Sequence, residues 1–421
     1  MTPPAGNTPA ASAQASGAGG KPAKHRPVEV DIAGVNADAS SMDSRIAKPA
    51  AKTTSGPGFP TGLRKLDTGD IEDLQILNAE GDVDSKLDPK LPPQELKKIH
   101  RAMVLSRKLD QRMLTMQRQG QMGTFAPGIG QEATQIGQVY PLTKEDWFCP
   151  SYRSFGAQMW RGWPIDQLLL LWDGFHEGFA PPEGVNDLPF CIVIGSHVPT
   201  ATGIAMGMRI RKHLGCAMVN FGDGASSQGI VNESLNFAAV YKAPVVFLLE
   251  NNGWAISMPA TKQVATETYA VRGIGFGIPS MRVDGNDVLA VLVAAQRACE
   301  RARGGEGPTL IEALTYRMSV HTTADDPKVY RDDAEVKEWE RRDPIRRFEI
   351  YLKNKKVLDD AAIARVHEEC EQEVLAARDK FRARAIARPR EVFDYVYANQ
   401  TMELEAQKRE YLAKLDKKKI E

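Results

Sequence analysis

The chain has 421 residues, of which 26% are charged, and its 54 Lys and Arg residues balance its 54 Asp and Glu residues. This balance gives no basic footprint for nucleic acid, no apolar run reaches the roughly eighteen residues of a membrane helix, and no secretory segment follows Met1, so we expect a cytoplasmic protein. Five scattered cysteines without a Cys-x-x-Cys pair argue against a cysteine-based zinc site or a disulfide framework.

The first ninety residues contain one aromatic side chain, Phe59, and residues 1–60 are rich in Ala, Pro, Gly and Ser. Such a segment cannot bury enough apolar surface to offset its chain entropy, so we predict a disordered extension over residues 1–60. A mitochondrial transit peptide is the alternative, although the segment is neither Arg-rich nor clearly amphipathic. Residues 61–92 then form an N-terminal arm, with a small hairpin predicted over residues 74–83.

The part of the chain that follows shows the periodicity of a folded domain. Pro92-Pro93 begins a long helix with apolar residues at helical spacing, and Gly120 ends it. From there to residue 311, helices alternate with short apolar runs, which lie at residues 190–194, 216–221, 244–249 and 309–313. This alternation predicts an α/β fold with a parallel sheet that helices cover on both faces.

One strand-helix-strand unit carries the most informative residues. The run at 216–221 leads into Gly222-Asp223-Gly224, a helix is predicted over residues 226–242, and the run at 244–249 leads into Asn251-Asn252-Gly253-Trp254. A helical crossover makes the two strands parallel, so their carboxyl ends lie at the same edge of the sheet. Asp223 and Asn252 are therefore expected to meet.

These residues suit a magnesium diphosphate site. Mg²⁺ prefers hard oxygen ligands, which Asp223 and Asn252 supply. Gly222 and Gly224 allow close approach of the backbone to a diphosphate, and a helix that starts at Ser226 would offer free N–H groups. A lone Gly-Asp-Gly is usually only a turn, but the Asn pair at the next strand end favours a functional site.

The residues Gly222-Asp223-Gly224 and Asn251-Asn252 resemble the thiamine diphosphate motif. Residues 93–400 are similar to the alpha subunit of 2-oxo acid dehydrogenases, the thiamine-dependent first component of those complexes. The segments that carry this resemblance lie in the family's order at residues 117–120, 130–133, 152–153, 182–186, 305–312 and 321–327. The resemblance implies a thiamine diphosphate-binding fold with a helical C-terminal region.

The resemblance also implies roles for individual residues. Mg²⁺ would be bound by the side chains of Asp223 and Asn252 and by the backbone carbonyl of Trp254. The cofactor would contact further residues, namely Tyr152 and Arg153 at the diphosphate, Ile192 and Ile194 around the aminopyrimidine, and Gly222, Gly224 and Ala225 in the turn. The side chain of Ile194 would hold the cofactor in its bent form.

A loop over residues 317–330 resembles the family's active-site loop and contains His321. A histidine can give or accept a proton near neutral pH, so His321 is expected to contact the cofactor and to assist acyl transfer to a lipoyl group. Arg317, Asp325 and Tyr330 would order the loop. Two other histidines near the site, His176 and His197, are interpreted as structural.

Two departures from the family pattern affect the site. Glu250 stands where some relatives place an Arg that neutralises phosphate, which puts diphosphate contact at this position in doubt. Cys191 and His197 replace residues that hold a potassium ion in branched-chain enzymes of animals, so we predict no potassium site. The sequence leaves open whether the loop is regulated by phosphorylation.

One component of the family's chemistry is missing from this chain. A glutamate beside the pyrimidine ring comes from the beta subunit in this family, and only one thiamine-type domain fits between residues 93 and 332. An α₂β₂ heterotetramer is therefore expected, with residues 333–421 forming a helical region that contacts the partner and with a lipoyl domain of the acyltransferase component as a second partner.

The resemblance implies oxidative decarboxylation of a 2-oxo acid and transfer of the acyl group to the lipoyl domain. The expected substrate is pyruvate, because residues 117–133, 182–189 and 321–331 are most similar to bacterial pyruvate-type alpha chains. Three alternatives stay open: a branched-chain enzyme that acts on 2-oxoisovalerate, an acetoin dehydrogenase alpha chain, and a non-catalytic subunit that binds a partner.

Overall fold

The computed structural model describes residues 62–65, 71–386 and 388–418. The disordered extension predicted over residues 1–60 and part of the predicted arm lie outside these residues. Within the described part of the chain, every helix is too short or too polar to cross a membrane.

Two β-sheets are present in the described residues. The larger has the strand order β1-β2-β8-β9-β5-β4-β3, and all neighbours run parallel except β1, which is antiparallel to β2 at one edge. The smaller pairs β6 with β7. The strands are β1 (Gly62–Lys65), β2 (Glu72–Gln75), β3 (Trp147–Cys149), β4 (Ala217–Gly222), β5 (Val245–Asn251), β6 (Trp254–Ala255), β7 (Met258–Pro259), β8 (Ser280–Asp284) and β9 (Thr309–Leu314).

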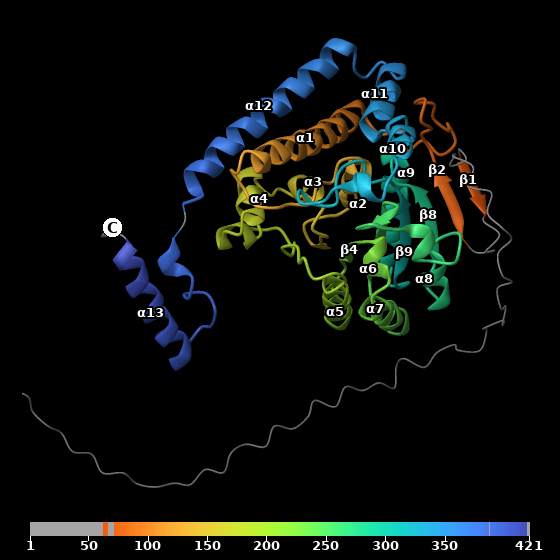
Figure 1. The fold of residues 1–421 in the computed structure, drawn as a ribbon. Coiled ribbons are helices and arrows are strands. Elements are labelled where there is room, and N and C mark those ends of the chain that lie inside the picture. Colours follow the sequence, from red (N-terminus) through yellow and green to blue (C-terminus); the bar gives the residue numbers. More distant parts are fainter. Residues whose placement is uncertain (1–61, 66–70, 387, 419–421) are drawn as a thin grey trace, which may run out of the picture. The chain divides into compact units, whose positions relative to one another are not determined.

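Helices connect these strands and continue beyond the last one (Figure 1). The α-helices are α1 (Pro93–Arg118), α2 (Glu132–Val139), α3 (Phe155–Trp160), α4 (Ile165–Trp172), α5 (His197–Ile210), α6 (Asp223–Ser226), α7 (Gly229–Val240), α8 (Val271–Gly275), α9 (Val288–Arg303), α10 (Asp333–Glu340), α11 (Pro344–Asn354), α12 (Asp360–Arg384) and α13 (Met402–Lys418). Short 3₁₀ helices are η1 (His176–Phe179), η2 (Ala260–Lys262), η3 (Pro327–Val329) and η4 (Pro389–Glu391). The α/β fold class predicted from the sequence is confirmed.

The sheet has an apolar core on each face. In β5, Val246 and Leu248 pack into a core with α1, α2 and α9, whereas the alternate residues Phe247 and Leu249 pack into a core with α5 and α7. Successive side chains of a strand point to opposite faces, so both faces of β5 are buried from solvent. This double burial explains why the central strands are continuous apolar runs rather than alternating ones.

The predicted strand-helix-strand unit forms, with one correction. β4 and β5 are parallel, and Gly222 lies opposite Glu250 at their carboxyl ends. The predicted helix over residues 226–242 is divided into the single turn α6 and the helix α7, because Gln228 between them is extended, with φ −75° and ψ 137°. The long helix therefore begins at Gly229, so its N-terminus does not follow the Gly-Asp-Gly turn directly as predicted.

The apolar run at residues 190–194 is not a strand. The backbone there forms a bend that leads into α5, and its central side chains are exposed, Ile192 to 65% and Val193 to 68%. β3 is the edge strand on this side of the sheet, and the chain bridges it at Asp187, before this run begins. Sequence alone could not distinguish this run from a buried strand, since both are short and apolar.

The N-terminal arm contributes the strands β1 and β2 at one edge of the sheet, and the hairpin predicted over residues 74–83 forms as a single antiparallel bridge. Residue Leu77 bridges Val83 in antiparallel fashion, but the preceding strand β2 pairs with β8. Asp287 holds the arm in place, because one carboxylate oxygen accepts the N–H groups of Ile76 and Leu77 at 2.7 and 2.6 Å. The other oxygen caps the N-terminus of α9.

Helices α11 and α12 pack on the domain core. α12 runs alongside α1 (Figure 1), and Phe348, Leu352 and Phe381 are buried in the same apolar core as α1. Arg347 of α11 is fully buried and pairs with Asp284 at the end of β8 at 2.7 Å. These contacts join residues 344–384 to the sheet.

Candidate active site

A cavity of about 260 Å³ opens at the carboxyl ends of β4 and β5. Ligands of open α/β sheets bind at this edge, where loops follow the strands. Its walls come from five separate parts of the chain, and the lining residues are Ser151, Tyr152, Arg153, Cys191, Ile194, Gly195, His197, Gly222, Asp223, Gly224, Ala225, Gln228, Glu250, Asn252, Trp254, Ala255, Ile256 and His321.

Asp223, Asn252 and Trp254 meet in this cavity as the sequence predicted. Asp223 is 2% exposed, and its Oδ2 accepts an N–H from Gln263 at 2.8 Å. The amide oxygen of Asn252 accepts the backbone N–H of Trp254 at 3.3 Å, and its Nδ2 donates to Gln131 at 3.2 Å. These bonds fix a carboxylate and an amide oxygen at adjacent strand ends.

The electrostatics of Asp223 favour a bound cation. Burial raises the pKa of Asp223 to about 6, although the hydrogen bond from Gln263 acts in the opposite direction. A buried carboxylate that ionises this reluctantly is stabilised by a metal ion. A carboxylate, an amide oxygen and a backbone carbonyl are hard oxygen ligands, so the donor set fits Mg²⁺.

Gly224 supports close packing of the turn. A Cβ atom on Gly224 would lie 2.8 Å from the Cβ of Ala255, closer than carbon atoms approach, whereas Gly222 has open space around the equivalent position. A side chain at position 224 would therefore clash with Ala255, so this position needs glycine. The space beside Gly222 stays open on the cavity side.

Two guanidinium groups converge on His321. Arg153 Nη2 and Arg317 Nη1 both lie within hydrogen-bond distance of His321 Nδ1, at 2.8 and 2.9 Å. Arg153 also donates to the carbonyls of Pro127 and His321, each at 2.7 Å. Because Nδ1 accepts these bonds, the neutral imidazole carries its proton on Nε2. Arg153 lines the cavity, so its guanidinium is a suitable partner for an anionic ligand.

The loop that carries His321 is ordered by the residues the sequence singled out. The backbone N–H of His321 donates to Asp325 at 2.7 Å, and the Tyr330 hydroxyl donates to the same carboxylate oxygen at 2.6 Å. Arg317 Nη2 reaches the Tyr330 hydroxyl at 2.9 Å and the Ile256 carbonyl at 2.8 Å. Partial burial and then the charges of Arg153 and Arg317 lower the pKa of His321 to about 3.

His321 should therefore stay neutral at pH 7 in the cofactor-free protein. Because its folded pKa lies below the unfolded value of 6.5, the unfolded state binds more protons between about pH 6.5 and 3, and stability falls as pH drops through this window.

The Cε1 resonance of His321 in ¹³C-histidine-labelled protein should not shift between pH 8 and 5. Arg153→Met should raise the midpoint, while a wild-type midpoint above 6 would contradict this electrostatic account.

Glu250 lies at the cavity wall in a fully buried hydrogen-bond network. Its Oε1 accepts from Asn220 Nδ2 at 2.9 Å, and burial raises its pKa to about 7. Asn220 also donates to Gln138 and accepts from Ser154, while its carbonyl accepts from His197 Nε2 at 2.7 Å. At neutral pH the Glu250 carboxyl is only partly ionised, which weakens its repulsion of a diphosphate.

Most of the predicted site residues line the cavity, and one does not. Ile194 lines it with 42% of its surface exposed, whereas Ile192 is absent from the lining. His176 lies elsewhere and stacks on Tyr395 at 4.1 Å. Sequence analysis missed Gln228, Gln263 and Ile256, because they belong to no short motif and reach the site through the fold.

The sequence belongs to a known protein family. Residues 100–390 match the family model described as the dehydrogenase E1 component, and the chain belongs to that family.

The most informative relatives are bacterial. The chain is 44% identical over 331 residues to the pyruvate dehydrogenase E1 component subunit alpha of Acholeplasma laidlawii, which covers 78% of this chain and 96% of the relative. It is 43% identical over 309 residues to the protein of the same name from Staphylococcus aureus strain Mu50, with 73% and 84% covered.

Proposed function

We propose that this protein is the alpha subunit of a thiamine diphosphate-dependent enzyme that oxidatively decarboxylates pyruvate and passes the acetyl group to a lipoyl domain. The observation that carries this proposal is the meeting of Asp223, Asn252 and Trp254 with Arg153 and His321 in one cavity. The names of the relatives at 43–44% identity favour pyruvate over a branched-chain acid or acetoin.

Residues of this chain would hold the cofactor at its diphosphate end. Asp223, Asn252 and the carbonyl of Trp254 would bind Mg²⁺, and Arg153 together with Tyr152 would bind the diphosphate oxygens. When bound, thiamine diphosphate would supply a nucleophilic thiazolium carbon for the carbonyl of the 2-oxo acid. The buried walls of the cavity exclude water from this chemistry.

The role of His321 follows from its contacts. An anionic diphosphate would draw the Arg153 guanidinium toward itself and so reduce the positive charge that Nδ1 now faces. The part of the lowering of the His321 pKa that comes from the charge of Arg153 would then be relieved, whereas the larger part, which comes from burial, would remain. We assign proton transfer during acyl transfer to His321 Nε2.

A partner subunit would complete the site. Within the described residues, the carboxyl groups that line the cavity are those of Asp223 and Glu250. Both already accept hydrogen bonds from side chains of this chain, Asp223 from Gln263 and Glu250 from Asn220. Ile194 and Ile256 line the cavity yet are 42% and 57% exposed, so part of its wall is an open apolar surface. Such a surface marks a protein interface, which supports an α₂β₂ assembly in which the beta chain supplies the activating glutamate.

His321→Ala should impair acyl transfer more than decarboxylation. A positioned acid or base contributes about 10²–10⁴-fold to a proton-transfer step, so reductive acetylation of the lipoyl domain should slow by at least about 100-fold. Decarboxylation measured with an artificial electron acceptor should fall by much less. Equal losses in the two half-reactions would remove His321 from the transfer step.

The substrate is tested by steady-state kinetics of the reconstituted enzyme with pyruvate, 2-oxoisovalerate and acetoin. A hydrophobic pocket separates substrates that differ by a methylene by about 1–3 kcal/mol, so pyruvate should be preferred in kcat/KM by at least about tenfold, with some cross-activity. A preference for 2-oxoisovalerate would assign the protein to the branched-chain class, and acetoin as the best substrate would assign it to the acetoin class.

A further inference from the structure

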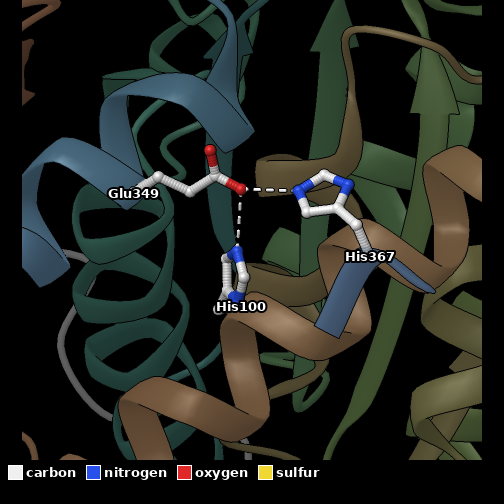
Figure 2. Close-up of side chains that lie close together, drawn as sticks. All are labelled: His100, Glu349 and His367. Atoms are coloured by element: carbon white, nitrogen blue, oxygen red, sulfur yellow. Dashed lines mark hydrogen bonds and ion pairs between the residues drawn. The ribbon is translucent and has the colours of Figure 1, made fainter. Parts of the chain in front are cut away.

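Three helices far apart in the sequence bring two histidines and a glutamate together outside the cavity (Figure 2). His100 lies on α1, Glu349 on α11 and His367 on α12. The Nε2 atoms of His100 and His367 lie 3.0 and 2.7 Å from the same oxygen, Oε1 of Glu349. The three ligand atoms are within 4.8 Å of one another.

The charge and burial of this cluster suit a divalent cation. The side chain of His100 is 0% exposed, that of Glu349 is 20% exposed and that of His367 is 36% exposed, so the cluster is buried on one side and open on the other. Both imidazole rings lie within hydrogen-bond distance of the same Glu349 carboxylate oxygen, so the three side chains already converge on one point. With neutral imidazoles the cluster carries one net negative charge.

We propose that His100, Glu349 and His367 form a binding site for a borderline divalent transition metal such as Zn²⁺. Two imidazole nitrogens and one carboxylate are ligands that such metals prefer, whereas Mg²⁺ prefers oxygen alone. Tetrahedral zinc with bonds of about 2.0–2.1 Å separates its ligand atoms by about 3.3 Å, so the two N···O pairs, now 3.0 and 2.7 Å apart, would each open by about 0.3–0.6 Å on metal binding. Water can supply the fourth ligand from the open side at His367.

Zinc binding would change the protonation of His100. Its Nε2 now donates to Glu349 Oε1 at 3.0 Å, whereas a metal ligand needs the lone pair on this atom and therefore a proton on Nδ1. Nδ1 is buried and has no hydrogen-bond partner among the described residues, so metal binding would have to offset this unpaired donor.

The metal would stabilise the folded chain and would take no part in catalysis. None of the residues that line the cavity belongs to α1, α11 or α12. A metal held by one residue from each helix would fasten α11 and α12 to α1, which packs on the sheet. Because the metal binds the folded state, it should raise the melting temperature without changing the catalytic constants.

The test uses the reconstituted complex, saturated with Mg²⁺ and thiamine diphosphate, titrated with Zn²⁺ against a chelating indicator. The wild type should bind one more Zn²⁺ per alpha chain than His367→Gln or Glu349→Gln. Loss of a direct ligand should weaken binding by more than the roughly 10–100-fold caused by loss of an outer-shell partner. The matched control is His213→Gln, an exposed histidine that is not part of the cluster.

A second measurement keeps the proposal testable if a variant folds poorly. At a hundredfold excess over its dissociation constant, Zn²⁺ should raise the melting temperature of the wild type and of His213→Gln by about 2–6 °C and should not raise that of Glu349→Gln. Equal zinc affinity and stoichiometry in the wild type and both cluster variants would overturn the proposal. So would a wild-type complex that binds no zinc at micromolar concentrations.

Discussion

Replacing Asp223 by Asn should abolish Mg²⁺-dependent binding of thiamine diphosphate while leaving the cofactor-free protein at least as stable as the wild type. The substitution removes the charged metal ligand, and the shape of the side chain is kept. Burial has raised the pKa of Asp223 to about 6, so the ionised carboxylate at pH 7.5 is a cost to the cofactor-free fold. Removing that charge should recover on the order of 1–3 kcal/mol.

Calorimetric titration of the complex with thiamine diphosphate and Mg²⁺ measures the first effect, and the melting temperature without cofactor measures the second. We expect the affinity to fall by at least about 100-fold, since a metal ligand is lost. The control is Asp360→Asn, which removes an exposed carboxylate at the start of α12 and should change neither quantity. Wild-type affinity in Asp223→Asn would reject the metal assignment.

The purified chain on its own should show no measurable decarboxylation of pyruvate. Its cavity has an exposed apolar wall at Ile194 and Ile256. The two carboxyl groups in the cavity already accept hydrogen bonds, that of Asp223 from Gln263 and that of Glu250 from Asn220. The described residues therefore offer neither a closed, water-free site nor a further carboxylate to activate the cofactor.

Adding a beta-type partner chain should restore activity, with a saturation curve that ends at equimolar chains. Initial rates with an artificial electron acceptor provide the measurement. A partner with its activating glutamate replaced by Gln is the matched control, because it should assemble but not activate. Turnover by the pure alpha chain would overturn the account of a site shared between subunits.

The central part of the fold could be predicted because its signals are local. The runs that form β4, β5 and β9 are apolar and short. Asp223 follows the end of β4, and Asn252 follows the end of β5. A parallel crossover then brings the two ends together whatever the details of packing. For the same reason, the meeting of the two predicted magnesium ligands followed from the sequence.

Other features depend on contacts that only the folded chain creates. The run at residues 190–194 has the composition of a strand, but the chain bridges the edge strand β3 at Asp187, before this run, and the side chains of Ile192 and Val193 lie at the surface. The predicted helix after Asp223 is broken at Gln228, which no proline or glycine immediately before it signals.

The electrostatics of the site could not be read from the sequence for the same reason. Arg153 and Arg317 are 164 residues apart, yet both contact His321 Nδ1 and shift its pKa away from the neutral range. Gln263 reaches Asp223 from a loop 40 residues later. A motif identifies residues that can act together, but their protonation states follow from the neighbours that the fold supplies.

The central claim is that Asp223, Asn252 and Trp254 bind the metal that carries the cofactor diphosphate. The most direct measurement is a crystal structure of the α/β complex with thiamine diphosphate and Mn²⁺ in place of Mg²⁺, with anomalous diffraction used to locate the metal. We predict a peak about 2.0–2.3 Å from an Asp223 carboxylate oxygen, the Asn252 amide oxygen and the Trp254 carbonyl. A cofactor-bound complex whose metal lies away from these three atoms would contradict the account.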